Sequence, residues 1–319
     1  MSKSDSDFSL PIIAAAAEVA RAVSARVLFA YVHAVENVPG LLDAVKPPTK
    51  VVLICRDARD EELVDAAKVE KLFVPAFDLT RMGQIKMATL IAFSQQLLRA
   101  GDVFVFLAGI SGRSVDTLVT MRVGEEYELF QSVGQPKLTE HIRRPVFEKV
   151  LRMTLELAHE GREGKPVGSL FVIGDHREVL KYSFAGRINP FKGYTERQRN
   201  ILDDSMTDTV KEIAKLDGAF IIKGNGVIVS ACAILRPAHV GEQLPQGLGS
   251  RHAAASGITA TTRSIAISLS ESTGDVRVWR RGEMITELER SQHSSHDLTP
   301  TPTRKALRPD SGAKRPDTG

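Results

Sequence analysis

Apolar residues come in two kinds of run over about the first 130 positions of the chain. Short runs of about four to eight apolar residues predict buried strands, and longer runs with apolar positions three or four apart predict helices. In chain order we expect a helix at 10–25, a strand at 26–32, a helix at 38–45, a strand at 50–56, a helix at 60–70, a strand at 71–77, a helix at 80–101 and a strand at 102–109. Buried strands separated by helices are typical of a parallel sheet covered on both faces, so this part predicts a doubly wound α/β domain.

The second half of the chain begins with an amphipathic helix, predicted over 144–161, and a strand at 169–175. The apolar stripe of this helix consists of Val146, Val150, Met153 and Leu157. A further helix is predicted from Thr195, with Thr195 as its N-cap and Gln198 at the capping-box position. Asn225-Gly226 separates two β-rich runs and predicts a hairpin turn rather than a phosphate loop, because no helix follows it.

Beyond this hairpin, Ser250 precedes an alanine-rich run and predicts a helix start with Ser250 as N-cap. Strands are predicted at 264–270 and 274–285, joined by a Ser-Thr-Gly turn. Hairpins mixed with helices predict a mixed-sheet α/β second domain of α+β-like character. The chain then divides into an N-terminal domain at 1–140, a second domain at 141–289 and a tail at 290–319, which is rich in Ser, Thr and Pro and is predicted to be disordered.

Composition narrows the class of protein. A length of 319 residues, with 43% apolar and 25% charged residues, is typical of a soluble protein of two domains. No window approaches the roughly 18 consecutive apolar residues of a membrane span, so we expect a cytoplasmic protein with no membrane partner. The net charge of +3 is too small to predict a nucleic-acid partner. Cys55 and Cys232 lie in strand-like runs and predict buried, reduced thiols rather than zinc ligands.

Polar residues gather at three predicted strand ends of the second domain. The three groups are Asp217-Gly218-Ala219, Ser250-Arg251-His252 and Ser270-Glu271-Ser272-Thr273-Gly274. If these strand ends meet at one edge of the sheet, they bring together a carboxylate, a guanidinium, a hydroxyl and an imidazole, as nucleotidyl transfer requires. Each group alone also fits a purely structural role: a strand start for Asp217, a partly buried histidine for His252 and a hairpin turn for 271–274.

Taken together and in this order, the segments DGAFIIKGNGVIVSACAIL, LGSRHAAASGIT and ISLSESTGDVRV resemble the diadenylate cyclase family, whose hallmarks are D-G-A, G-T-R-H-R and S-E-x-T-G motifs. The similarity extends over about 165–286 and includes NPFKGY upstream. The resemblance implies that two catalytic domains meet face to face, each with one ATP, and that each 3′-hydroxyl attacks the α-phosphate of the other ATP. It further implies cyclic di-AMP and two pyrophosphates as products, Mn²⁺ or Mg²⁺ as the cofactor, and an inactive lone subunit.

The same resemblance assigns roles to individual residues. Asp217 is expected to be the metal ligand or general base, and Arg251 and His252 are expected to contact the phosphates during catalysis. The residues expected to bind ATP are Gly218, Ala219, Leu235, Gly249, Ser250, Ser270 and Glu271. Within this set, Leu235 is expected to pack on the adenine.

Two positions depart from the family pattern. Ala253 stands in place of the family's second arginine, and Ser272 stands in place of a glutamate that is common there. Loss of one charged phosphate contact lowers transition-state stabilisation by about 2 kcal/mol or more. Either Arg263 or Arg236 compensates and the chain is an active cyclase, or the chain is a weak or inactive sensor of ATP or cyclic di-AMP. We favour the enzyme because the other polar residues of the motifs are retained. A third alternative, a DNA-associated scaffold, is supported only by the basic tail.

The N-terminal part carries a second resemblance. The segment RAGDVFVFLAGISGRSVDTLVTMRV is similar to the end of the C-terminal α/β domain of pyruvate kinases, and the similarity covers about 10–130. In those enzymes the domain binds a phosphorylated effector and forms subunit contacts, so the resemblance implies a domain for assembly or regulation of a homo-oligomer. A cyclase domain behind such a domain is similar to the arrangement of archaeal diadenylate cyclases. Ser111-Gly112-Arg113-Ser114 is either an anion site or a plain loop, and we favour the loop.

Overall fold

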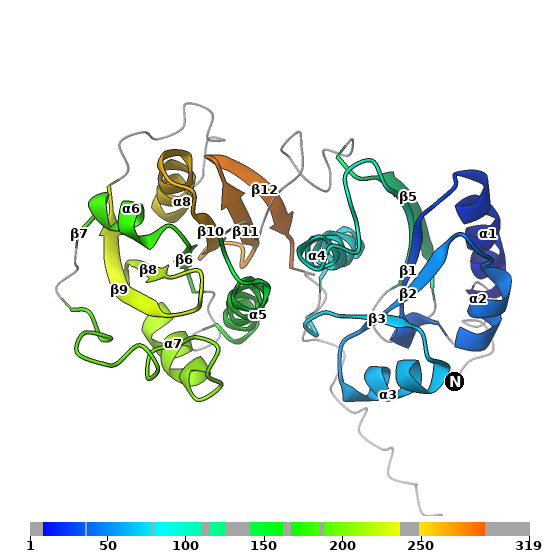
Figure 1. Ribbon diagram of the computed structural model, residues 1–319, viewed down its shortest axis with the longest axis horizontal. Coiled ribbons are helices and arrows are strands. Elements are labelled where there is room, and N and C mark those ends of the chain that lie inside the picture. The colour runs from blue at the N-terminus through cyan, green and yellow to red at the C-terminus, as the bar shows by residue number, and fades with distance from the viewer. Residues whose placement is uncertain are drawn as a thin grey trace, which may run out of the picture.

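The protein is described by a computed structural model over residues 9–35, 37–77, 79–109, 115–124, 141–161, 167–184, 188–236 and 249–290. The segment 111–114 and the predicted tail beyond Arg290 lie outside these residues. The described residues form a five-stranded sheet in the first part of the chain and a seven-stranded sheet in the second. Both sheets carry helices, so the molecule has the α/β character that the sequence predicted (Figure 1).

The first sheet has the strand order β3-β2-β1-β4-β5. Its strands are β1 (Val27–Tyr31), β2 (Lys50–Cys55), β3 (Glu70–Phe73), β4 (Val103–Ala108) and β5 (Thr117–Arg122). The central strand β1 pairs in parallel with both β2 and β4 and is buried along its whole length, as expected for a strand covered on both faces. The predicted doubly wound parallel sheet is confirmed for β1 to β4 and corrected at one edge, where β5 pairs antiparallel with β4.

Three of the helices of this part begin at side-chain caps. They are α1 (Ser9–Ala22), η1 (Val32–Ala34, a 3₁₀ turn), α2 (Val38–Ala44), α3 (Ala58–Ala67) and α4 (Arg81–Ser94). The side chains of Asn37, Asp57 and Thr80 accept backbone N–H groups in the first turns of α2, α3 and α4. Helices α1 and α2 cover the outer face of the sheet, and α4 lies on the face turned toward the second sheet (Figure 1).

The second sheet has the strand order β12-β11-β10-β6-β8-β9-β7. Its strands are β6 (Ser169–Ile173), β7 (Ser183–Phe184), β8 (Ala219–Ile222), β9 (Ile228–Leu235), β10 (Ile265–Leu269), β11 (Val276–Arg280) and β12 (Glu283–Leu288). Only the β6–β8 pair is parallel among the pairs of this sheet that the structure describes, and the others are antiparallel. The predicted mixed sheet is therefore confirmed.

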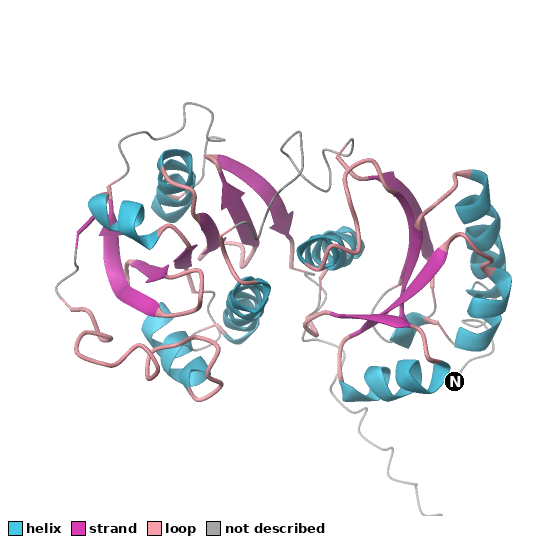
Figure 2. Ribbon diagram, in the orientation of Figure 1, coloured by secondary structure: helices cyan, strands magenta, loops and turns pink. Residues whose placement is uncertain are grey.

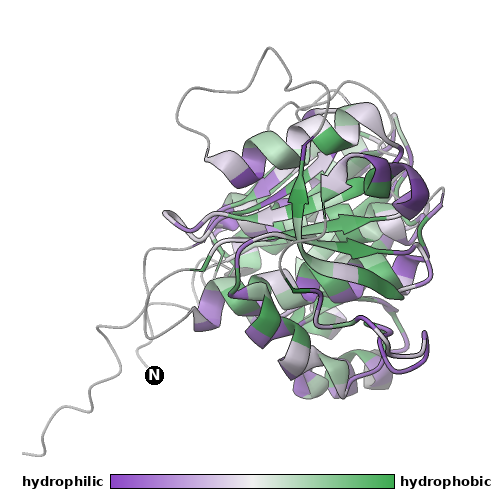
Figure 3. Cartoon of the chain, turned by 90° about the vertical axis from the view of Figure 1, so that its left-hand side faces the viewer, coloured by the Kyte–Doolittle hydropathy of each residue, from purple (hydrophilic) through white to green (hydrophobic). Residues whose placement is uncertain are grey.

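Helices cover both faces of the second sheet (Figure 2). They are α5 (Arg144–Glu160), α6 (His176–Lys181), α7 (Met206–Ala214) and α8 (Ser250–Thr261). Helix α8 buries Ala255 and Ile258 in an apolar cluster with Ala266 and Trp279 of the sheet. The predicted stripe of α5 is buried against the opposite face. The apolar strands consequently lie between helices that keep their polar residues outward (Figure 3).

Three predictions of local structure need correction. The helix expected from Thr195 starts at Met206 instead, because the backbone of Arg199 and Ile201 bonds Ile228 and Gly226 of the hairpin. The strand expected over 274–285 is split into β11 and β12 by a turn at Arg281-Gly282, where both residues have positive φ. Helix α8 begins one residue earlier than predicted, so Gly249 is the N-cap and Ser250 is the first helical residue.

Other local predictions hold. The Asn225-Gly226 turn joins the antiparallel strands β8 and β9, with Gly226 at φ +97°. Both cysteines are free thiols; Cys55 is buried and Cys232 is half-buried rather than fully buried. None of the helices in the described ranges combines the length and apolar character needed to cross a bilayer.

Candidate functional site

The three polar groups meet at one end of the second sheet. The start of β8 lies beside the start of β6, since Ala219 pairs with Leu170, and the end of β10 lies at the same end, since Leu269 pairs with Ser169. Asp217 and Gly218 precede β8 directly, and Ser270 and Glu271 follow β10 directly. The sheet therefore brings together segments that are more than fifty residues apart in the chain.

Arg251, in the first turn of α8, joins the two carboxylates of this site. Its Nη2 lies 2.7 Å from Oδ1 of Asp217 and its Nη1 lies 2.9 Å from Oε2 of Glu271. The arginine side chain is 26% exposed, whereas the Asp217 side chain is 99% exposed. One guanidinium thus holds two carboxylates at the solvent boundary, where an incoming anion can compete for it.

The start of α8 adds backbone donors to the site. The N-cap, Gly249, has no side chain, and no side-chain cap bonds the first turn among the described residues. The N–H groups of Ser250 and Arg251 precede the first backbone bonds of the helix, which His252 and Ala253 make to the Gly249 carbonyl. Neither N–H group has a partner among the described residues, and such groups at the positive end of the helix dipole favour an anion here.

Two glycines make the close approaches possible. A Cβ on Gly168 would lie 2.5 Å from Nη1 of Arg251, so the guanidinium passes directly over this residue. Gly218 has φ +110°, and a Cβ there would overlap the backbone of Cys232. Cys232 itself has φ +54° and lies where the register between β8 and β9 shifts, which marks a β-bulge beside Asp217.

The remaining residues expected to bind ATP are placed as follows. Ala219 is buried at the start of β8 opposite Ala233, and Leu235 ends β9, half-buried and opposite Ser183. The Ser270 side chain is buried: its hydroxyl bonds the Ser272 hydroxyl at 3.1 Å and accepts the Thr273 N–H. Ser270 thereby shapes the turn that presents Glu271.

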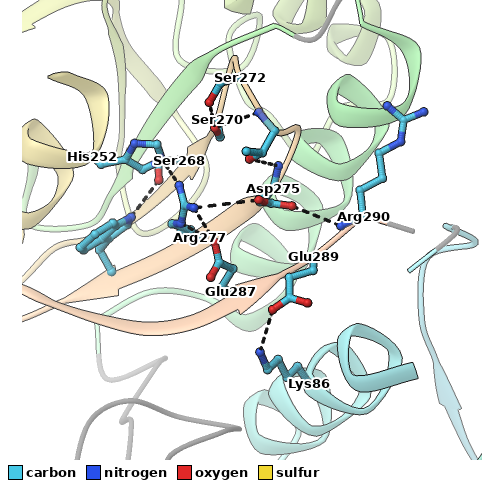
Figure 4. Close-up of polar contacts among 12 residues, drawn as sticks. Lys86, His252, Ser268, Ser270, Ser272, Asp275, Arg277, Glu287, Glu289 and Arg290 are labelled. Carbon is cyan, nitrogen blue, oxygen red and sulfur yellow. Dashed lines mark hydrogen bonds and ion pairs between the residues drawn. The ribbon is translucent and has the colours of Figure 1, made fainter. Parts of the chain in front are cut away.

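The His252 side chain, next to Arg251 in the first turn of α8, faces strand β11 rather than solvent. It is 5% exposed, its Nε2 is 2.7 Å from Nη1 of Arg277 on β11, and its ring centroid lies 6.1 Å from that of Trp279 (Figure 4). Burial, followed by the charges of Arg277 and Arg251, lowers the pKa of His252 to about 4. The imidazole is therefore neutral at pH 7.

The two cations that could replace the missing family arginine lie at different places. Arg263 follows the far end of α8, where its N–H bonds Asp175, about 18 Å of helix from Ser250. Arg263 is thus too far away to contact the same phosphate. Arg236 directly follows β9 and stacks over the Phe184 ring at 4.6 Å from its centroid, at the end of the sheet where Asp217 lies.

Sequence reasoning missed Gly168 and Arg277. Gly168 stands immediately before a strand, and a glycine in that position signals a close approach, although the sequence does not say to what. Arg277 was missed because its hydrogen-bond partners come from α8 and from β12, far from it in the sequence.

The carboxylates also bear on metal binding. No group of three or more His, Cys, Asp or Glu side chains with metal-site geometry occurs in the part of the chain that the structure describes. Asp217 and Glu271 nevertheless bond the two terminal nitrogens of one guanidinium, which places both carboxylates at the same site. One or two carboxylates are what Mg²⁺ or Mn²⁺ takes from a protein when phosphate oxygens supply other ligands, so the donor set fits such an ion.

Comparison with known proteins identifies two matching families. Residues 156–284 match the family described as "DisA bacterial checkpoint controller nucleotide-binding". Residues 9–130 match the family described as "Probable sensor domain DacZ_P". All three polar groups of the site lie within the first of these matches.

Three solved structures that match the chain are the following. A hypothetical membrane spanning protein from Bacillus cereus is 22% identical, with a TM-score of 0.37 over 48% of this chain and 67% of that one. A double mutant of DacA from Staphylococcus aureus is 22% identical, with a TM-score of 0.30 over 44% of this chain and 83% of that one. A pyruvate kinase from Cryptosporidium parvum is 16% identical, with a TM-score of 0.31 over 36% of this chain and 22% of that one.

Similarity in sequence to curated proteins is stronger. A diadenylate cyclase from Methanocaldococcus jannaschii is 32% identical over 206 residues, which cover 62% of this chain and 63% of that protein. A diadenylate cyclase from Haloferax volcanii is 38% identical over 204 residues, which cover 62% of this chain and 72% of that protein. With this coverage, and with the three motifs inside the matched residues, the chain belongs to the diadenylate cyclase family.

Proposed function

We propose that this protein condenses two molecules of ATP into cyclic di-AMP and two pyrophosphates. The observation that carries the proposal is the convergence of Asp217, Arg251 and Glu271 at one end of the sheet, beside an uncapped helix start. A carboxylate, a guanidinium and free backbone N–H groups match the parts of a phosphoryl-transfer site.

The residues of the site take distinct roles in this reaction. The 3′-oxygen of one ATP forms a bond to the α-phosphorus of the other, the bond from that phosphorus to the pyrophosphate oxygen breaks, and the 3′-proton goes to Asp217. Arg251, released from its carboxylates by the phosphates, neutralises charge on the transferring group together with the backbone N–H groups of Ser250 and Arg251. The same exchange takes place twice, so two bonds form and two pyrophosphates leave.

Other residues shape the nucleotide site. Gly218 and Ala219 line the ribose and base, Leu235 packs on the adenine, and Gly249 and Ser250 hold phosphate. Ser270 and Glu271 close the site at the turn after β10. His252 contributes to catalysis from a buried position, because its ring lies against Arg277 and not at the solvent-exposed carboxylates.

Asp217 would hold a Mg²⁺ or Mn²⁺ ion, with Glu271 beside it. When bound, such an ion neutralises phosphate charge and withdraws electrons from the α-phosphorus. The hard carboxylate oxygens of this site support the choice of these ions over zinc.

The reaction requires two nucleotides, which supports a site shared by two subunits. We infer that catalytic domains, at about 141–289, meet face to face in a homo-oligomer, and that the domain at about 1–140 regulates or assembles it. Use of ATP as substrate supports a cytoplasmic location. The match of 9–130 to a sensor-domain family supports the regulatory role.

One observation favours a second function. Ala253 lies where the related motif has a cation, and Arg263 lies too far away to replace it, which leaves Arg236 as the candidate. If Arg236 does not compensate, the protein binds ATP or cyclic di-AMP without turnover and acts as a sensor.

The deciding experiment incubates the purified full chain with ATP and Mn²⁺ or Mg²⁺ and measures cyclic di-AMP by mass spectrometry. We expect product in the wild type and at least a hundredfold less in Asp217→Asn, which keeps the shape of the side chain but removes its charge and basicity. Asp208→Asn, on the exposed side of α7, is the matched control and should retain activity. If the wild type binds ATP but forms no product with either metal, the cyclase proposal is wrong and the sensor is the function that remains.

A further inference from the structure

We propose that Arg277 is a positioning residue for the nucleotide site: by holding His252 it fixes the first turn of α8, from which Arg251 reaches Asp217 and Glu271. Arg277 lies on β11 with its side chain 11% exposed, and its Nη1 is 2.7 Å from Nε2 of His252. For its activity readout this inference rests on the proposed cyclase function.

Arg277 is itself anchored on the side away from His252. Its Nε donates to Oε1 of Glu287 at 2.6 Å, and its Nη2 lies against the same oxygen. Asp275, 3.9 Å from Nη2, adds a second carboxylate, and both carboxylates are largely buried (Figure 4). The guanidinium is planar and held along one edge, so the direction of the Nη1 donor toward the imidazole is fixed as well.

This contact decides which nitrogen of His252 carries the proton. A guanidinium offers only donors, so Nε2 must accept and Nδ1 must carry the hydrogen. Nδ1 is buried and has no hydrogen-bond partner among the described residues. The hydrogen bond to Arg277 is therefore the one contact that selects the tautomer of the ring.

The position of His252 determines that of its neighbour. Consecutive residues of a helix point about 100° apart, so holding His252 against β11 also fixes the direction in which the Arg251 side chain leaves the same turn. Among the described residues, side-chain hydrogen bonds to this turn come from Asp217, Glu271 and Arg277. Phosphates that bind Arg251 displace Asp217 and Glu271. Of the three contacts, the bond from Arg277 to His252 then remains to orient the turn.

The test compares variants in which Glu287, the carboxylate that bonds Arg277 directly, is neutralised, while Asp275 keeps its hydrogen bond from the Arg290 N–H. In a Glu287→Gln background, Arg277→Met removes the donor and keeps the length of the side chain, and Arg277→Lys restores one donor. We expect kcat for cyclic di-AMP formation to fall at least tenfold with Met relative to Glu287→Gln alone, KM for ATP to change less than threefold, and Lys to recover at least part of kcat. Arg281→Met, in the exposed turn of the same hairpin, should change neither constant.

A second readout does not depend on turnover. Nuclear magnetic resonance of ¹⁵N-labelled histidines, with the His252 signal assigned through His252→Gln, should show the Nδ1–H tautomer in the wild type and appearance of the Nε2–H tautomer with Arg277→Met. An unchanged tautomer, or kcat within threefold of the Glu287→Gln background, would overturn the role of Arg277. A wild type that makes no cyclic di-AMP would remove the proposed function, and the tautomer would still decide whether Arg277 holds His252.

Discussion

A single buried imidazole gives the stability of this protein a dependence on pH. The pKa of His252 is lowered to about 4, first by burial and then by Arg277 and Arg251, with Asp275 acting in the opposite direction. An exposed histidine in the unfolded chain titrates near pH 6.5. Between these values the unfolded chain binds more protons than the folded one, so stability falls as the pH is lowered from about 6.5 to about 4. We expect His252 to contribute at most about 3 kcal/mol to this loss.

Urea unfolding at a series of pH values measures the effect. His252→Gln keeps a hydrogen-bond acceptor for Arg277 but does not titrate, so its free energy of unfolding should depend less steeply on pH across this window. His33 and His176 also have lowered pKa values and contribute equally to both proteins, so the difference between the two curves isolates His252. Parallel curves would show that the folded protein accepts a proton on His252 without penalty.

The same residue shows how far sequence reasoning reaches. The Arg251-His252 pair was predicted as part of a polar site, and Arg251 does meet both carboxylates. The sequence does not show that His252 turns to the sheet, because this depends on Arg277, 25 residues further along the chain. Residue type and order were enough for the motifs, whereas the environment of each side chain follows from tertiary packing.

At the scale of elements, α8 is held at its middle by the β11–β12 turn. The Ser256 hydroxyl donates to the Gly282 carbonyl at 2.7 Å, and the Gly282 N–H donates to the Thr259 hydroxyl at 3.2 Å. Gly282 has φ +83°, and a Cβ there would lie 2.9 Å from Cβ of Ala260. Gly282→Ala should therefore displace α8 and lower both the free energy of unfolding and kcat.

Gly101→Ala separates backbone strain from packing. Gly101 has φ +81°, close to that of Gly282, but a Cβ there meets nothing within 4 Å. Both variants carry the strain of a positive φ, about 1 kcal/mol, and Gly282→Ala should lose about 1–2 kcal/mol more in denaturant unfolding because of the clash. Equal losses, with equal activity, would mean that the turn does not position α8.

Local signals predicted the elements where a short segment determines its own structure. The Asn225-Gly226 turn and the alternation of strands and helices before position 109 were predicted in this way. The helix expected from Thr195 was wrong although its capping signal is real, since the Thr195 N–H bonds the Gln198 side chain at 3.1 Å. Pairing of this segment with the hairpin uses the backbone groups that a helix needs, and that competition is not visible in the sequence.

At the scale of the whole molecule, α4 joins the first sheet to the edge of the second. The Thr80 N–H donates to the Glu289 carbonyl at 3.4 Å, and Nζ of Lys86 lies 3.7 Å from the Glu289 carboxylate. The Ser94 hydroxyl, at the other end of α4, donates to Glu148 of α5 at 2.9 Å. Buried apolar residues of both parts belong to one continuous cluster, so the two sheets share a core at this contact.

Arg290 connects this contact to the site. Its N–H bonds Asp275, which lies beside Arg277, and its guanidinium donates to the Ala158 carbonyl of α5 at 3.3 Å. The residue was predicted as the start of a disordered tail, yet it forms a bridge with Leu79 before the described chain ends. A displacement of α4 would therefore be transmitted through Glu289, Arg290 and Asp275 to β11, the strand that carries Arg277.

Gly83→Leu tests whether this docking is rigid. A Cβ on Gly83 would lie 3.1 Å from the Glu289 carbonyl oxygen, so a leucine forces α4 away from the end of β12. Leucine also forms helices better than glycine, by about 0.8 kcal/mol, which opposes the strain at the cap of α4, where the same Cβ would lie 3.2 Å from Oγ1 of Thr80. We expect amide exchange in β12 to rise at least tenfold, and thermal unfolding to separate into two transitions.

Ala15→Leu, on the exposed side of α1, adds the same side chain away from this contact and should leave both the exchange rate and the unfolding transition unchanged. If Gly83→Leu unfolds in one transition with unchanged exchange in β12, α4 is not what couples the two sheets.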